Sequence, residues 1–143
     1  MHHIRTFIID DSVTIRAMMS RVLSEDRDIS IVGMAASAAE AEAMLAKTAV
    51  DVVTLDIEMP GVGGLDYLPT LVARSLPVVM LSGSTARGDT ARTRALLSGA
   101  AGCFDKANAI RESKALIKLV KAAAMHKVRL DPTDAAAVAA AKG

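Results

Sequence analysis

Short apolar runs alternate with segments of helical periodicity along almost the whole chain. The runs are rich in β-branched and aliphatic side chains, and they span residues 7–9, 29–32, 52–55, 78–81 and, more weakly, 100–104. None alternates strictly with polar residues, which is typical of strands buried on both faces of a parallel sheet. Between the runs, apolar residues recur at spacings of three and four. The pattern predicts an α/β fold of repeated strand–helix units, with five strands, five helices and a helix layer on each face of the sheet.

Composition limits the class of protein further. The chain has 143 residues, which is enough for one domain, and it is 52% hydrophobic and 23% charged, which excludes a disordered tail protein. Only 2% of the residues are aromatic, so the core must be aliphatic. Seventeen basic and sixteen acidic residues give a net charge of +1, which argues against nucleic-acid binding. One cysteine allows no internal disulfide.

The sequence shows neither a membrane-spanning segment nor an N-terminal secretory signal. No apolar run approaches the roughly 20 residues that cross a bilayer, and the first residues do not resemble a secretory signal. We therefore expect a cytoplasmic protein without membrane contact.

We expect one folded domain over residues 1–127. Residues 128–143 form an alanine-rich tail, which is either flexible or a short helix, because a helix of that length is marginal in water.

Polar residues follow the apolar runs at four predicted strand ends. Asp10 and Asp11 follow the first run, Asp56 the third, Ser82 the fourth and Lys106 the fifth. The carboxyl ends of parallel strands meet at one edge of a sheet, where ligands bind. A single aspartate at such a place is more often a helix cap. The combination of the four ends, however, predicts a functional site.

The residue types indicate metal-assisted phosphoryl chemistry. Neighbouring carboxylates repel one another unless a cation lies between them, and oxygen ligands without histidine or cysteine favour Mg²⁺ over zinc. The Lys106 ammonium suits a phosphate or a carboxylate, and the Ser82 hydroxyl can donate to a phosphate oxygen. Asp56 can act as a nucleophile, because a carboxylate can form an aspartyl-phosphate.

Four segments together resemble the receiver domain of two-component response regulators, over about residues 5–127. They are Ile-Ile-Asp-Asp-Ser at 8–12, Val-Val-Thr-Leu-Asp-Ile-Glu-Met-Pro at 52–60, Val-Val-Met-Leu-Ser at 78–82 and Phe-Asp-Lys at 104–106. Within that family, residues 54–60, 77–82 and 85–88 are most similar to the receiver of the chemotaxis methylesterase. The resemblance implies a doubly wound, flavodoxin-like (βα)₅ fold with strand order 2-1-3-4-5.

The resemblance also implies a role for each site residue. Asp56 would accept the phosphoryl group from a histidine kinase or a phosphotransfer protein. Asp10 and Asp11 would hold Mg²⁺ together with Asp56. Ser82 would hydrogen-bond the phosphoryl group, and Lys106 would pair with it.

Two further residues of the site follow from the same resemblance. The backbone carbonyl of Glu58, or that of its neighbour, would complete the metal ligands. The side chains of Glu58 and Ser84, each two residues after a principal site residue, would tune how fast water removes the phosphoryl group.

The sequence departs from the family pattern at three places. Val-Gly-Gly stands at 62–64 where the family often has Met-Asp-Gly. Cys103 stands at the position of the family's switch aromatic, and we expect Phe104 to face the opposite side of the strand. Ala107 replaces the proline that usually follows the lysine, so we expect no cis bond there. The usual signalling switch is therefore not expected to work through the same packing.

We expect a stand-alone response regulator, because the residues after 127 are too few for an output domain. Its output would be phosphorylation-dependent binding of a downstream protein whose identity the sequence does not give, and it would be a monomer or a weak dimer. The alternative is a phosphate sink or shuttle in a phosphorelay, without a target of its own. Beyond its own aspartyl phosphorylation and dephosphorylation, we expect no enzymatic activity.

Overall fold

The predicted alternation of strands and helices is confirmed. The computed structural model describes residues 3–83 and 88–129. Their elements, in chain order, are β1 (Ile4–Ile9), α1 (Val13–Leu23), β2 (Ile29–Ala35), α2 (Ala38–Leu45), β3 (Val52–Asp56), α3 (Gly64–Ala73), β4 (Val78–Ser82), α4 (Gly88–Leu97), β5 (Gly102–Asp105), the 3₁₀ turn η1 (Lys106–Asn108) and α5 (Ser113–Arg129).

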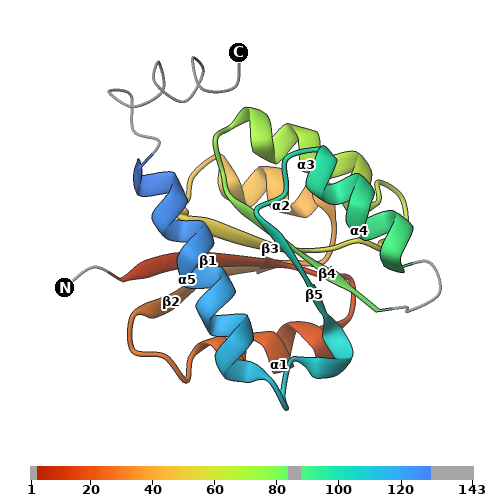
Figure 1. Ribbon diagram of the computed structural model, residues 1–143. Helices are drawn as coiled ribbons and strands as arrows, with labels where there is room; N and C mark the ends of the chain where they lie inside the picture. The colour runs from red at the N-terminus through yellow and green to blue at the C-terminus, as the bar shows by residue number, and fades with distance from the viewer. Residues whose placement is uncertain (1–2, 84–87, 130–143) are drawn as a thin grey trace.

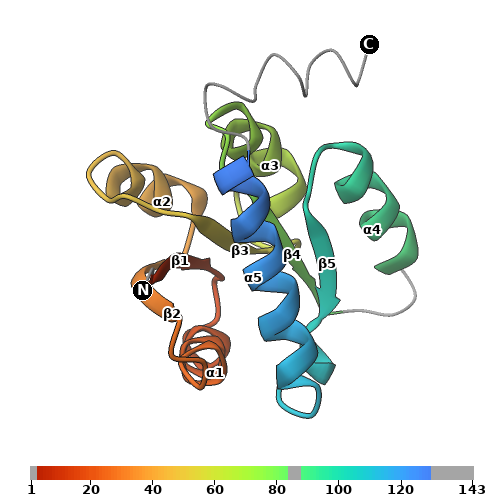
Figure 2. The ribbon, with the colours of Figure 1, turned by 60° about the vertical axis from the view of Figure 1, so that its left-hand side comes forward.

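The five strands form one parallel sheet in the order β2-β1-β3-β4-β5, as predicted. Helices α1 and α5 cover one face, and α2, α3 and α4 cover the other (Figures 1 and 2). Every residue of β3 and β4 is buried, because these strands have neighbours on both edges and helices on both faces. The sheet therefore holds the carboxyl end of β3 in a rigid position at its centre.

Two aliphatic clusters, one on each face of the sheet, make up the core. Alternate residues of each strand enter different clusters: Val53 and Leu55 pack with α2, α3 and α4, whereas Val52 packs with α1 and α5. Within the described residues, no helix is long and apolar enough to cross a membrane.

Cys103 and Phe104 lie on opposite faces of β5, as the strand alternation predicts. Cys103 packs on the α4 side, where its Sγ lies 3.9 Å from the carbonyl oxygen of Arg92, and Phe104 packs with the α1 and α5 cluster. Burial raises the pKa of the half-buried Cys103 thiol, and the charge of Arg92 opposes this shift. Phe104 therefore does not supply an aromatic ring where Cys103 stands.

Helix α5 extends two residues past the expected domain boundary at residue 127 and ends at Arg129. Alanine and lysine, which are good helix formers, are frequent in its last turns and carry the helix onward. The rest of the expected tail, residues 130–143, lies outside the described residues, as does Ser84.

The two glycines before α3 have different reasons to be glycine. Gly63 precedes the helix with a φ of −70°, which any residue adopts, and a Cβ there would meet nothing closer than 3.7 Å. A Cβ on Gly64 would lie 2.0 Å from the backbone oxygen of Asp56. Only Gly64 is therefore required, because the start of α3 packs directly against the end of β3.

We expect Gly64→Ala to lower the free energy of unfolding by at least about 2 kcal/mol, because backbone atoms must move to admit the methyl group. Gly63→Ala is the matched control, with an expected loss of no more than about 1 kcal/mol. Urea unfolding of the two variants and the wild type measures both effects. Equal losses in the two variants would contradict the close packing of Gly64 on Asp56.

Candidate functional site

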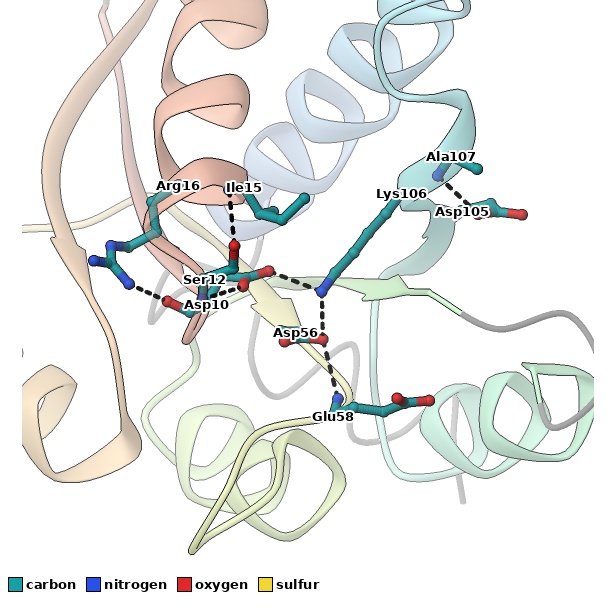
Figure 3. Close-up of polar contacts among 9 residues, drawn as sticks. All are labelled: Asp10, Ser12, Ile15, Arg16, Asp56, Glu58, Asp105, Lys106 and Ala107. Atoms are coloured by element: carbon teal, nitrogen blue, oxygen red, sulfur yellow. Dashed lines mark hydrogen bonds and ion pairs between the residues drawn. The ribbon is translucent and has the colours of Figure 1, made fainter.

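The sheet brings four of the predicted site residues to one edge. Asp10 directly follows β1, Asp56 ends β3, and Ser82 ends β4. The register pairs Ser82 with Asp105, the residue before Lys106. All of these positions are at the carboxyl ends of their strands, and Figure 3 shows the side chains of Asp10, Asp56 and Lys106 turned toward one another.

The Lys106 ammonium lies between two buried carboxylates. Its Nζ is 2.8 Å from Oδ1 of Asp56 and 3.0 Å from Oδ2 of Asp10. The Lys106 side chain is 16% exposed, whereas those of Asp10 and Asp56 are 0% and 1% exposed. Breaking such a buried arrangement leaves an uncompensated charge and is costly, so the three side chains fix one another's positions.

Backbone groups hold the two carboxylates from the other side. The Ser12 N–H donates to Oδ1 of Asp10 over 2.9 Å, and the Glu58 N–H donates to Oδ1 of Asp56 over 3.0 Å. The Ser12 hydroxyl also accepts from the N–H of Ile15 and caps α1 (Figure 3). The loops after β1 and β3 are thus folded around the carboxylates that they carry.

The arrangement leaves carboxylate oxygens without hydrogen bonds. Oδ2 of Asp56 is buried and has no hydrogen-bond partner, and Oδ2 of Asp10 contacts Lys106 without the geometry of a hydrogen bond. One carboxylate oxygen each from Asp10, Asp11 and Asp56 can be chosen so that all three lie within 4.8 Å of one another. Three hard oxygen ligands with unsatisfied capacity fit a divalent cation such as Mg²⁺.

Burial is the main influence on the pKa of Asp56. The net pKa of Asp56 is raised to about 6. Burial raises it most and the charge of Asp10 adds to the effect, while Lys106 and the Glu58 N–H lower it. For Lys106, burial lowers the pKa, but the close contacts with the charged Asp56 and Asp10 carboxylates outweigh it, so the net pKa is raised. Near neutral pH, Asp56 is therefore mainly ionised and Lys106 is charged.

Two predicted site residues are not part of this cluster. The carboxylate of Glu58 points away from Asp56 and Lys106 (Figure 3), and only its backbone N–H contacts the site. A metal-binding role of its backbone carbonyl stays a prediction. Ser84 lies outside the described residues, so its role also stays a prediction.

One contact at the site is not predicted from the sequence. Nη1 of Arg16 donates to the backbone oxygen of Asp10 over 2.7 Å. Arg16 belongs to the first turns of α1. It stands six residues after Asp10, and no sequence motif links the two residues. The helical spacing alone could have indicated it, because a long side chain on the first turns of a helix can reach back to the strand that precedes it.

We expect the Asp56→Asn variant to gain stability relative to the wild type as the pH rises from about 4 to 7 in Mg²⁺-free buffer. Because the pKa of Asp56 is raised in the folded protein, the folded state binds more protons than the unfolded chain in this window, so the wild type loses stability as the pH rises. The difference in unfolding free energy should grow by roughly 1–3 kcal/mol. Urea unfolding at each pH measures it.

Glu25→Gln, a similar change at an exposed carboxylate, is the control for this experiment. A difference between Asp56→Asn and the wild type that stays constant across the pH range would show that burial does not shift the Asp56 carboxyl.

Comparison with known proteins agrees with the geometry. Residues 6–119 match the model of the response regulator receiver domain. A protein-glutamate methylesterase/protein-glutamine glutaminase of Caulobacter vibrioides is 42% identical, over 94% of this chain and 42% of that protein. One from Rhizobium etli is 44% identical, over 71% of this chain and 30% of that protein. The chain thus spans less than half the length of these curated relatives.

Solved structures show the same fold. The response regulator domain of Thermotoga maritima CheB superposes with a TM-score of 0.76 at 27% identity, over 92% of this chain and 100% of that one. The receiver domain of NarL from Mycobacterium tuberculosis gives a TM-score of 0.73 at 27% identity, over 85% and 98% of the two chains. With its fold, its acidic cluster and the match over residues 6–119, the chain belongs to the family of response regulator receiver domains.

Proposed function

We propose that Asp56 accepts a phosphoryl group from a phosphohistidine of a kinase or phosphotransfer protein, and that the phosphorylated domain signals by binding another protein. The observation that carries this proposal is the contact of the Lys106 ammonium with Asp56 and Asp10, 2.8 and 3.0 Å away, beside an Asp56 oxygen without a hydrogen bond. A nucleophilic carboxylate needs a free oxygen and a nearby cation, and Asp56 has both.

The chemical step joins an oxygen of Asp56 to phosphorus and breaks the phosphorus–nitrogen bond of the donor histidine, whose nitrogen then takes a proton. Lys106 is placed to offset the roughly −1.5 to −2 charges that the phosphoryl group brings. Ser82, buried at the end of β4, would donate its hydroxyl to a phosphoryl oxygen. When bound by Asp10, Asp11 and Asp56, Mg²⁺ supplies positive charge for the phosphoryl oxygens.

Hydrolysis reverses the modification, because water attacks phosphorus and releases inorganic phosphate and the free carboxylate. We propose that the side chains of Glu58 and Ser84 tune the rate of this step. The Glu58 carboxylate is exposed, lies two residues after Asp56 and takes no part in the buried cluster. Its position at the solvent side of the site supports an influence on the water that attacks phosphorus. We propose that catalysis by this domain is limited to its own phosphorylation and dephosphorylation.

We expect the wild-type chain, incubated with a small phosphodonor such as acetyl phosphate and Mg²⁺, to gain the mass of one phosphoryl group. Asp56→Asn should gain none, because the amide is not a nucleophile, and omission of Mg²⁺ should suppress the gain. Intact-mass spectrometry measures all three samples. No gain in the wild type, or an equal gain in Asp56→Asn, would refute phosphorylation at Asp56.

The two candidate outputs differ in whether a partner recognises the phosphorylated form. We expect a cellular protein to bind the chain with at least about tenfold higher affinity when Mg²⁺ and the phosphoryl mimic beryllofluoride are present, which is a typical allosteric coupling. Affinity capture from a lysate with and without beryllofluoride identifies the protein, and titration of the purified protein measures the change in its affinity. Asp56→Asn is the control. Rapid dephosphorylation without any such partner would favour the phosphate sink or shuttle instead.

Stand-alone action is a separate part of the proposal. The methylesterase activity named for the relatives is theirs, and this chain spans 42% or less of the two named above. Immunodetection of the native protein in its source cells tests the proposal. A band at the mass expected for 143 residues supports stand-alone action, and a band at a much larger mass would show a receiver domain within a larger regulator.

A further inference from the structure

Arg16 contacts the acidic cluster at a backbone atom instead of a carboxylate. It lies in α1 and is half-buried, and its Nη1 donates to the backbone oxygen of Asp10 over 2.7 Å. Figure 3 shows the guanidinium on the side of Asp10 away from the Lys106 ammonium. Asp10 is thus held between two cations, one at its carboxylate and one at its carbonyl group.

The carbonyl group that Arg16 holds belongs to the peptide bond between Asp10 and Asp11. The N–H of Asp10 still bonds across the sheet to the Ala35 oxygen over 3.0 Å, but its carbonyl lies beyond the last residue of β1. A charge-assisted hydrogen bond from a guanidinium fixes such a carbonyl more strongly than a neutral donor would. The orientation of this peptide plane sets the direction in which Asp11 leaves the strand.

Asp11 depends on its backbone for its position. Its side chain is exposed, and within the described residues no hydrogen bond or ion pair to its carboxylate is seen. By contrast, the carboxylates of Asp10 and Asp56 are held by Lys106 and by the backbone N–H groups of Ser12 and Glu58. The peptide that carries Asp11 therefore needs a separate support.

We propose that Arg16 is a positioning residue for the metal site: by holding the Asp10–Asp11 peptide, it keeps the Asp11 carboxylate beside those of Asp10 and Asp56. This inference rests on the proposed function, because it assumes that the three carboxylates bind Mg²⁺. Groups that orient metal ligands in this way typically contribute 10–100-fold to metal affinity.

Electrostatics alone makes the opposite prediction. Arg16 carries a positive charge close to the carboxylates, so it repels a divalent cation, and its removal would strengthen Mg²⁺ binding. A purely structural link between α1 and β1 predicts a third result, in which stability falls and the Mg²⁺ affinity of the folded protein does not change. The direction of the change in affinity therefore distinguishes the three roles.

The test is a titration of the full chain with MgCl₂, followed by the backbone amide NMR signals of Ser12 and Glu58. We expect Arg16→Met, which keeps the aliphatic stem but loses the donor and the charge, to weaken Mg²⁺ binding about tenfold. Arg16→Lys, which keeps a charged donor, should restore the affinity to within about threefold of the wild type. Arg21→Met removes the same charge at an exposed position in the last turn of α1 and should leave the affinity unchanged.

Unchanged or tighter binding in Arg16→Met would overturn the positioning role while leaving the proposed function intact. Absence of Mg²⁺ binding in the wild type would instead refute the metal site itself, and the inference with it. The dispersion of the NMR spectrum reports whether each variant is folded. If Arg16→Met is unfolded, Arg16→Leu, which also has no charge and no donor, takes its place under the same criteria.

Discussion

The contact of the Lys106 ammonium with two buried carboxylates is the interaction on which the site depends. Asp10 follows β1, Asp56 ends β3 and Lys106 follows β5, and the strand order β2-β1-β3-β4-β5 brings these positions together although they are distant in sequence. Burial makes the Asp56 carboxylate costly to ionise, and the ammonium offsets part of that cost. The two aliphatic layers give the sheet the rigidity that keeps these charges within 3 Å of their partners.

Much of this arrangement can be predicted from the sequence because it depends on local patterns. Buried runs reveal the strands, and a parallel sheet gathers the polar residues that follow them at one edge. The orientation of single side chains cannot be predicted in the same way. The Glu58 carboxylate turns outward while its N–H holds Asp56, and Arg16 reaches back to the carbonyl of Asp10, just after β1. Both depend on loop and helix geometry that exists only after folding.

The departures from the family pattern also have physical consequences. Of the two consecutive glycines at the start of α3, Gly64 is required because it packs against the backbone of Asp56, whereas Gly63 has room for a side chain. After β5, the Ala107 N–H donates to Oδ1 of Asp105 over 2.9 Å, and this bond closes the turn that presents Lys106 (Figure 3). A proline at residue 107 would have no N–H to donate. The replacement of proline thus gives this turn a hydrogen bond of its own.

The surroundings of Asp56 also make its two carboxylate oxygens inequivalent. In water, the two oxygens of an ionised carboxylate are equivalent and exchange places by rotation about one bond. In the folded protein, Oδ1 accepts from the Glu58 N–H and contacts Lys106, whereas Oδ2 has no hydrogen bond. The fold therefore gives the two oxygens different surroundings: protein groups hold Oδ1, and Oδ2 has no hydrogen bond. A carboxylate with two chemically identical oxygens thus takes one defined orientation in the folded protein, and its two oxygens are no longer interchangeable.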